Sequence, residues 1–179
     1  MDHRDDIFYI NEVLRGNTAS YAQLIDRHKD KVFNLAFRIC SNREEAEEIA
    51  QDAFLKAYRS LKDFKGKSSF STWLYRIAYN TAISLVRSKR KGIVSIDDLP
   101  PGIADFVDYS GSGEDETDYR NYIVNFALQR ISEEERGLIT LYYFYDLDHE
   151  EISKITGISR TNIKVKMLRA RRKIAEIIR

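Results

Sequence analysis

Between Phe70 and Lys91, apolar residues recur at steps of three and four positions, which is the spacing of one face of an α-helix. These apolar positions are Trp73, Leu74, Ile77, Ala78, Ala82, Leu85 and Val86. A second stripe at the same period is polar and consists of Thr72, Arg76, Asn80, Ser84 and Arg87. The pattern predicts an amphipathic helix over residues 71–91.

The same helical period continues along most of the chain. It predicts a helix over 5–15, one or two more within 18–40, and further helices over 46–61, 119–131, 132–145, 148–156 and 159–177. Capping sequences begin several of them, at Ser41–Glu44, Ser132–Glu135, Asp148–Glu151 and Ser159. No segment alternates apolar and polar residues as a half-buried strand does, so the predicted fold class is all-α.

One segment interrupts the helical pattern. Both prolines and four of the eight glycines lie between Gly92 and Asp118, together with eight acids and no Lys or Arg. This composition predicts a flexible acidic linker over 92–118, with one small helical domain at 1–91 and another at 119–179.

The net charge of +1 conceals strong segregation of charge. Residues 56–91 contain ten basic side chains and one acid, and residues 159–179 contain eight basic side chains and one acid. Blocks of like charge indicate partners better than the total does, and these two blocks favour nucleic acid.

Several functional classes are disfavoured. The single cysteine, Cys40, rules out an internal disulfide, and no apolar run approaches the ~20 residues of a membrane span. The start of the chain has no apolar signal region, so a soluble, cytoplasmic protein is expected. The three histidines are scattered, and His149-Glu-Glu lacks the second histidine of a zinc-protease helix. We therefore expect no enzyme, no metal site and no cofactor.

Cations alternate with aromatic residues around the start of the helix at 71–91. Lys62, Lys65 and Lys67 surround Phe64 in a short preceding loop. Single-stranded nucleic acid suits such a surface, since phosphates meet the cations while unpaired bases stack or enter pockets. A solvated basic helix face without a ligand is the alternative.

The last two predicted helices, joined at Gly157-Ile158, fit a helix-turn-helix. The apolar positions Ile152, Ile155, Ile163, Met167 and Ala170 can meet between the helices, while polar and basic residues face outward. In this motif the first turns of the second helix enter the major groove. A basic helical hairpin with no DNA role is the alternative.

Taken together, FSTWLYRIAYN (70–80), AEEIAQDAFLKAYRSLKDF (46–64) and ISKITGISRTNIKVKMLRARRKI (152–174) resemble the bacterial extracytoplasmic-function (group IV) sigma factors of the sigma-70 family. The first domain is similar to sigma region 2 and the second to sigma region 4. The resemblance implies a protein that binds core RNA polymerase and directs it to promoters through −10 and −35 elements. A helix-turn-helix regulator that binds duplex DNA without polymerase is the alternative.

By resemblance, the loop at 62–71 and the following helix would bind the melted −10 element. The residues concerned are Phe64, Lys65, Ser68, Ser69, Phe70, Ser71, Trp73, Arg76, Asn80 and Arg87. At its position in the apolar stripe, Trp73 suits the core as well as it suits a base contact, and Tyr75 and Tyr79 are similarly divided.

The −35 element would be read by the second helix of the helix-turn-helix. The residues concerned are Ser159, Arg160, Thr161, Asn162, Lys164, Lys166, Arg169 and Arg171. The segment Ser-Arg-Thr-Asn-Ile departs from the small-residue start of many family members, so no relative's −35 preference is transferred.

The polymerase would be bound through both domains. The polar face of 46–61, formed by Glu47, Glu48, Gln51, Asp52 and Lys56, would meet the clamp helices, and a purely structural role for that face is the alternative. Leu138, Leu141, Tyr142 and Phe144 would contact the flap and their own core. The linker would thread the nucleic-acid channel or serve as a plain tether. An anti-sigma factor is expected from the resemblance alone.

Overall fold

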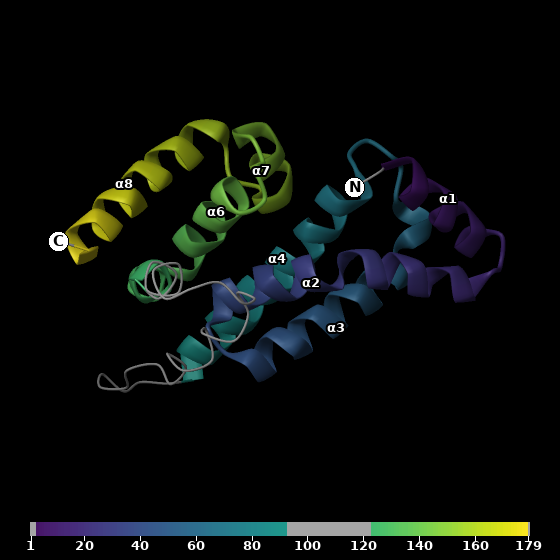
Figure 1. The fold of residues 1–179 in the computed structure, drawn as a ribbon, viewed down its shortest axis with the longest axis horizontal. Coiled ribbons are helices and arrows are strands. Elements are labelled where there is room, and N and C mark those ends of the chain that lie inside the picture. The colour runs from purple at the N-terminus through teal and green to yellow at the C-terminus, as the bar shows by residue number, and fades with distance from the viewer. Residues whose placement is uncertain (1–2, 93–122, 179) are drawn as a thin grey trace, which may run out of the picture.

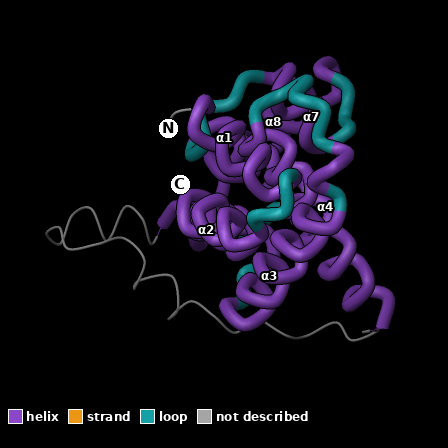
Figure 2. Tube along the Cα trace, turned by 90° about the vertical axis from the view of Figure 1, so that its right-hand side faces the viewer, coloured by secondary structure: helices purple, strands orange, loops and turns teal. Residues whose placement is uncertain are grey.

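The computed structural model describes residues 3–92 and 123–178, and all regular elements within these ranges are helical (Figures 1 and 2). The first group comprises α1 (His3–Leu14), η1 (Thr18–Ser20), α2 (Tyr21–Cys40), α3 (Arg43–Arg59), η2 (Leu61–Asp63) and α4 (Phe70–Gly92). The second comprises a helical segment at 123–128 followed by α6 (Glu133–Tyr143), α7 (His149–Thr156) and α8 (Arg160–Ile178). The all-α prediction of two helical domains is confirmed. The predicted linker begins at Gly92, which ends α4, and the rest of it lies outside the described residues.

The first domain is built on α2, α3 and α4, which pack against one another, with α1 lying across α2. Its fully buried side chains come from the apolar stripes of these helices: Leu24, Leu35 and Ile39 from α2, Ile49 and Ala53 from α3, and Leu74, Ala78 and Ala82 from α4. The stripe predicted for α4 therefore faces the core over most of its length, because residues three and four apart share one side of a helix.

The start of α3 differs from the predicted cap. Asn42 occupies the cap position, and its side chain accepts a hydrogen bond from the Glu45 amide at 2.8 Å. Ser41 instead ends α2 in a left-handed conformation with φ of 59°. The sequence prediction was wrong by one residue, because Ser and Asn are both good capping residues and stand side by side.

Two helices of the second domain, α6 and α7, begin with capping boxes that match the prediction. Ser132 begins α6 with Glu135 at its third helical position, and Asp148 begins α7 with Glu151 in the same relation. The hydrogen bond from the Glu151 amide, helped by that from the Glu150 amide, holds the pKa of the Asp148 carboxyl below its ordinary value, although desolvation acts against them. Both caps satisfy amides that would otherwise lack partners at a helix start.

The two domains lie against each other (Figure 1). The helix α6 packs on α2, and α7 packs on α4, so the apolar interiors of the domains form one continuous cluster. This arrangement was not predicted from the sequence, because the helices that meet are separated by more than fifty positions along the chain.

Candidate nucleic-acid and polymerase interfaces

The turn between α7 and α8 is held by local hydrogen bonds. Gly157 ends α7 at φ of 74°, a conformation that glycine adopts without the steric penalty of a side chain. The Ser153 hydroxyl donates to the Ile158 carbonyl at 2.7 Å across this turn. Ile152, Ile155, Ile163, Met167 and Ala170 are all buried between the helices, as the pattern predicted. The helix-turn-helix geometry is therefore present.

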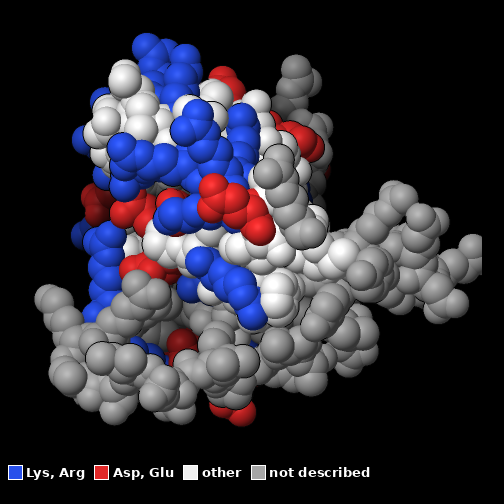
Figure 3. Space-filling view, turned by 90° about the vertical axis from the view of Figure 1, so that its left-hand side faces the viewer, with Lys and Arg blue, Asp and Glu red and all other residues white. Residues whose placement is uncertain are grey.

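The first turns of α8 present a polar surface to solvent. The exposed residues between 159 and 169 are Ser159, Arg160, Thr161, Asn162, Lys164, Val165, Leu168 and Arg169. The Ser159 hydroxyl accepts a hydrogen bond from the Asn162 amide at 3.4 Å, which leaves the Asn162 side chain outside the capping interaction. Figure 3 shows Lys and Arg side chains gathered on the upper part of one face, where Figure 1 places α8. These side chains can contact base edges and phosphates together.

Three basic residues farther along α8 are engaged within the protein. Lys166 pairs with Glu134 at 2.9 Å, and Lys173 pairs with Glu135 at 2.8 Å. The Arg171 guanidinium lies 5.6 Å and 5.4 Å from the ring centroids of Tyr142 and Tyr143. Arg171 thus points toward α6, away from the face formed by the first turns of α8, in contrast to the sequence prediction.

Lys173 also contributes to the cap of α6. Burial by itself would raise the pKa of the Glu135 carboxyl, but hydrogen bonds from Lys173 and from the Ser132 amide and hydroxyl outweigh it and hold the pKa below its ordinary value. The Lys173 ammonium therefore has a structural partner, so a phosphate contact by this residue would compete with the cap.

The loop before α4 and the start of α4 enclose a pocket of about 340 Å³. Its lining includes five predicted −10 residues that lie close together: Phe64, Lys65, Ser68, Trp73 and Arg76. The other lining residues are Asp63, Lys67, Thr72 and Lys154. Trp73 is half-buried, and its ring lies 5.3 Å from that of Phe64. The structure thus places Trp73 both against the core and at the pocket.

Three other predicted loop residues are not at the pocket surface. Phe70 is completely buried, and its ring contacts those of His28, Phe64 and Trp73. The Ser69 hydroxyl accepts a hydrogen bond from the Thr72 amide and lies 2.9 Å from the Ser71 hydroxyl. Phe70 therefore packs in the core behind Phe64 and Trp73, and Ser69 caps α4. The sequence had predicted direct base contacts for Ser69, Phe70 and Ser71.

Lys154 of α7 lines the same pocket from the other domain. Sequence reasoning missed this residue, since nothing in the spacing of 62–76 indicates which part of a distant helix will lie beside it. Among the lining residues are three further cations, Lys65, Lys67 and Arg76, and a single acid, Asp63. The pocket therefore combines aromatic rings with positive charge, which suits a base attached to phosphate.

The remaining α4 residues divide between surface and core. Arg76 and Asn80 are exposed, and Arg87 is exposed but pairs with Glu134 at 3.2 Å. Tyr75 and Tyr79 are buried, and burial raises the pKa of both hydroxyls. The sequence had left open whether these two tyrosines contact bases or pack in the core, and the structure places both in the core.

The polar face of α3 is available for a partner. Glu47, Glu48 and Gln51 are exposed, and Asp52 pairs with Lys56 at 2.7 Å. Lys56 also donates to the Thr81 hydroxyl at 3.1 Å, which ties this face to α4. Leu55 lies on the exposed side of α3 with 54% of its surface accessible, and sequence reasoning did not single it out. A single exposed leucine is ordinary at a protein surface, so Leu55 does not by itself indicate a binding partner.

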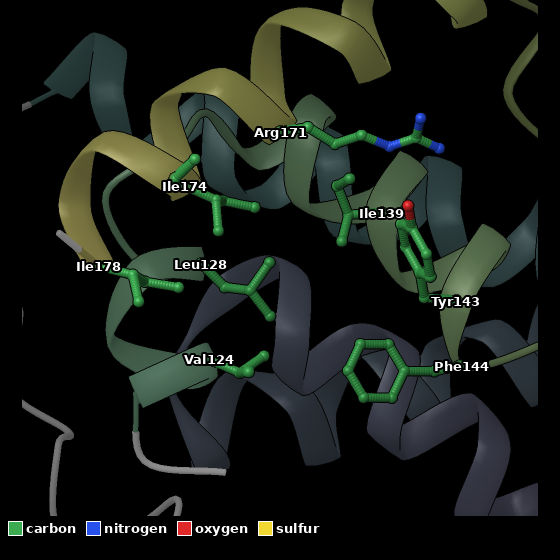
Figure 4. Close-up of a pocket in the computed structure, with 9 residues that line it drawn as sticks. Val124, Leu128, Ile139, Tyr143, Phe144, Arg171, Ile174 and Ile178 are labelled. Atoms are coloured by element: carbon green, nitrogen blue, oxygen red, sulfur yellow. The ribbon is translucent and has the colours of Figure 1, made fainter. Parts of the chain in front are cut away.

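An apolar groove of about 680 Å³ crosses the second domain (Figure 4). Its walls are Val124 and Leu128 from the helical segment at 123–128, Ile139, Tyr143 and Phe144 from α6 and its end, and Arg171, Ile174, Ala175 and Ile178 from α8. Val124, Tyr143, Phe144 and Ile178 are exposed although they are large and apolar. Of the residues expected at the polymerase flap, only Phe144 lies here, while Leu138 and Leu141 are buried in the core.

Comparison with known proteins identifies the family. The family description Sigma-70 region 2 matches residues 24–92, and Sigma-70, region 4 matches residues 123–174. The ECF RNA polymerase sigma factor SigW of Bacillus subtilis is 32% identical over 178 residues, which cover 95% of each chain. The RNA polymerase sigma-H factor of Pseudomonas aeruginosa is 32% identical over 174 residues, which cover 92% of this chain and 89% of that one. The chain belongs to the ECF sigma factors.

A sigma factor binds core RNA polymerase and directs transcription initiation at promoters, and that is the function of this chain. Sigma factors as a family are not enzymes. CnrH, solved in complex with the cytosolic domain of CnrY, shares the fold with a TM-score of 0.68 and 20% identity over 96% of this chain and 95% of that one. The sigma factor RpoE of Bartonella quintana, solved with the anti-sigma factor NepR, gives a TM-score of 0.68 and 21% identity over 88% and 96%.

The described part of this sigma factor has neither a cluster of metal-binding side chains nor a membrane-spanning helix. Within residues 3–92 and 123–178, no His, Cys, Asp and Glu side chains form a cluster suited to a metal ion. No helix in the same ranges has the length and apolar character needed to cross a membrane.

Proposed function

We propose that the two domains divide promoter recognition between them, with the loop pocket taking bases of the melted −10 element and the first turns of α8 reading the −35 duplex. The observation that carries this proposal is the exposure of Arg160, Thr161 and Asn162 at the start of the second helix of a helix-turn-helix. In this proposal the first domain comprises residues 1–91 and the second comprises residues 119–179.

At the −35 element, Asn162 and Arg160 are the base-reading residues. Asn can form two hydrogen bonds with adenine and Arg with guanine, each worth about 1–3 kcal/mol of discrimination. Lys164 and Arg169 are exposed at the sides of the same turns and would hold phosphates. Lys166 joins them once its pairing with Glu134 is released.

At the −10 element, a base extruded from the duplex would enter the pocket beside Phe64 and Trp73. Unstacking costs about 1–2 kcal/mol per step, and aromatic contacts in the pocket offset part of that cost. Lys65 and Arg76 would neutralise the adjoining phosphates, and Asn80 would meet the upstream duplex. The Ser68 hydroxyl lies at the pocket wall, where it can donate to a base edge.

Polymerase binding would use both domains. The face of α3 formed by Glu47, Glu48, Gln51 and Asp52 would dock on the clamp helices, with Leu55 supplying apolar contact. The apolar groove of the second domain would take an amphipathic helix of the polymerase flap, which would cover its exposed walls. The chain between the domains would pass through the polymerase channel, and no step would be catalysed by the sigma factor itself.

An anti-sigma factor is the second partner that we propose. Two sigma factors of this fold have been solved with such partners, named as the cytosolic domain of CnrY and the anti-sigma factor NepR. The exposed apolar groove and the acidic face of α3 are the surfaces that a regulator would have to cover in order to exclude polymerase.

A promoter library with randomised −35 sequences, transcribed by core polymerase with each variant, tests the −35 assignment. Asn162→Ala should relax the preference at one or two base pairs, by about 1–3 kcal/mol per position. The matched change Lys164→Ala should lower transcription from all sequences to a similar degree. Identical effects of the two changes on every sequence would refute the base-reading role of Asn162.

A further inference from the structure

The outward side of α8 carries an apolar stripe that the function proposed above leaves unused. Val165 and Leu168 are large apolar residues, yet their exposed fractions are 42% and 49%. Both lie outside the apolar cluster formed by the described helices, whereas Ile163 and Met167 of the same helix belong to it. The surface at the start of α8 is therefore not uniformly polar, and its apolar part is open to a ligand.

Helical geometry places this stripe at the centre of the outward face. At about 3.6 residues per turn, Thr161, Val165 and Leu168 lie within about 60° of one another around the helix axis. The buried positions Ile163 and Met167 lie on the other side of the helix. When the second helix of this motif enters a major groove, the stripe therefore points most directly at the floor of the groove.

The charges beside the stripe fit a polyanion. Lys164 on one side and Arg169 on the other are both exposed, and Arg172 continues the outward face one turn later. The one acid within α8, Glu176, lies near the end of the helix. An apolar strip between cations matches duplex DNA, in which the floor of the groove lies between two phosphate backbones.

The floor of the major groove offers such a stripe one apolar group, the C5 methyl of thymine. The remaining groups on that floor are hydrogen-bond donors and acceptors. A valine or leucine placed against them would exclude water without replacing its hydrogen bonds, which penalises bases that lack the methyl group. The same side chains gain free energy by covering a methyl group. The stripe thus favours thymine over the other bases at the positions that it meets.

The spacing along α8 sets where the thymines lie. Val165 and Leu168 are three positions apart, which is about 4.5 Å along the helix axis at ~1.5 Å per residue. Successive base pairs are about 3.4 Å apart. A helix lying along the groove therefore places these two side chains over neighbouring base pairs.

We propose that Val165 and Leu168 select thymine methyl groups at neighbouring base pairs of the −35 element. Arg160 and Asn162 read the hydrogen-bonding edges beside them, so the element is recognised through both polar and methyl contacts. This selection rests on the −35 function proposed above, because a helix that stays outside the groove contacts no methyl group.

Removing the methyl groups alone tests the proposal. The probes are promoter duplexes taken from the most active sequences of the randomised −35 library, with each thymine of the element replaced in turn by deoxyuracil. The replacement removes one methyl group and keeps the base pairing and every hydrogen-bonding group. Holoenzyme with the unchanged protein should bind the duplexes substituted at the two positions about fourfold more weakly, as expected for one buried methyl-sized group. Deoxyuracil in the spacer is the control and should leave binding unchanged.

Two variants assign the methyl groups to side chains. Val165→Ala should weaken binding of the thymine duplex about fourfold, and deoxyuracil at one of the two positions should then have no further effect. Leu168→Ala should do the same at the neighbouring position. Both residues are exposed, so neither change opens a cavity in the core. Leu14→Ala removes an exposed leucine from α1 and should leave the response to deoxyuracil unchanged.

Three results would overturn the proposal. They are selected −35 elements without neighbouring thymines, equal binding of the thymine and deoxyuracil duplexes, and a deoxyuracil effect that persists in both alanine variants. Loss of core polymerase binding in those variants, with unchanged promoter binding by the assembled holoenzyme, would assign the stripe to a protein partner instead.

The same duplexes separate this proposal from the −35 assignment itself. If Asn162→Ala and Lys164→Ala act as expected while deoxyuracil has no effect, the thymine selection fails and the −35 assignment stands. If neither of these changes alters binding of the element, the assignment of α8 to the −35 duplex fails, and the thymine selection fails with it.

Discussion

At the scale of single residues, the structure assigns different tasks to basic side chains that look alike in the sequence. Lys164 is exposed, Lys166 is paired across the domain interface, and Lys173 completes the cap of α6. All three belong to one run of basic residues on α8. Periodicity identified the helix and its buried side, but the partner of each lysine depends on which acids α6 brings close to it.

The pair between Lys173 and Glu135 makes a prediction about pH. The folded pKa of Glu135 is lower than its unfolded value, so the stability it contributes is present above about pH 4.5 and is lost as the pH falls through the folded pKa. Glu135→Gln should cost about 1.5 kcal/mol of unfolding free energy at pH 7. The cost should shrink as the pH falls through the folded pKa of Glu135, below 4.5. Urea unfolding at several pH values measures it.

The control for this experiment is Glu176→Gln, which changes an exposed acid on the same helix as Lys173. It should leave the unfolding free energy within ~0.5 kcal/mol of the unchanged protein at every pH. A pH-independent loss in Glu135→Gln would argue that the capping hydrogen bonds, and not the carboxylate charge, stabilise α6.

At the scale of elements, most helices could be predicted because local signals agree. The capping boxes at Ser132 and Asp148 and the glycine at 157 act within one turn of chain, so they are legible in the sequence. The sequence predicted a binding surface at the loop before α4, but not which side chains line the pocket there. Phe70 turns inward because His28 of α2 offers it a ring to pack against, and that neighbour is 42 positions away.

The turn of the helix-turn-helix gives a second prediction. Gly157→Ala places a side chain at φ of 74° and should destabilise the second domain by about 1–2 kcal/mol. Gly157→Asn should recover part of this loss, since asparagine tolerates the left-handed region better than alanine. Thermal unfolding followed by circular dichroism measures both. Equal stability of the two variants would show that backbone strain is not the cause.

The exposed face of α3 gives a third testable prediction. Asp52→Lys reverses a charge in the middle of the proposed clamp surface and should weaken core polymerase binding at least tenfold, equivalent to ~1.4 kcal/mol. The circular dichroism spectrum should be unchanged, since the ion pair between Asp52 and Lys56 lies at the surface. Asp26→Lys makes the same charge change on the exposed side of α2 and serves as the control. Equal loss of affinity in both variants would indicate a general charge effect and refute the clamp assignment.

At the scale of the whole molecule, two domains predicted as independent lie together as one cluster of helices. The sequence indicates each domain through its own periodicity, but not their contact, which depends on the shapes of α2, α4 and α6 after folding. A sigma factor that depends on core polymerase should bind duplex promoter DNA at least a hundredfold more weakly than the same protein with core polymerase. A gel-shift titration at fixed salt measures this ratio, and equal affinities would favour a polymerase-independent regulator.

The most direct test is to add the purified protein to sigma-free bacterial core polymerase with fragmented genomic DNA and to sequence the 5′ ends of the transcripts. Reactions with core alone and with the protein alone are the controls. The account predicts discrete start sites, found only with both components, that share two upstream sequence elements at a fixed spacing. Start sites without shared elements, or none beyond those of core alone, would contradict it.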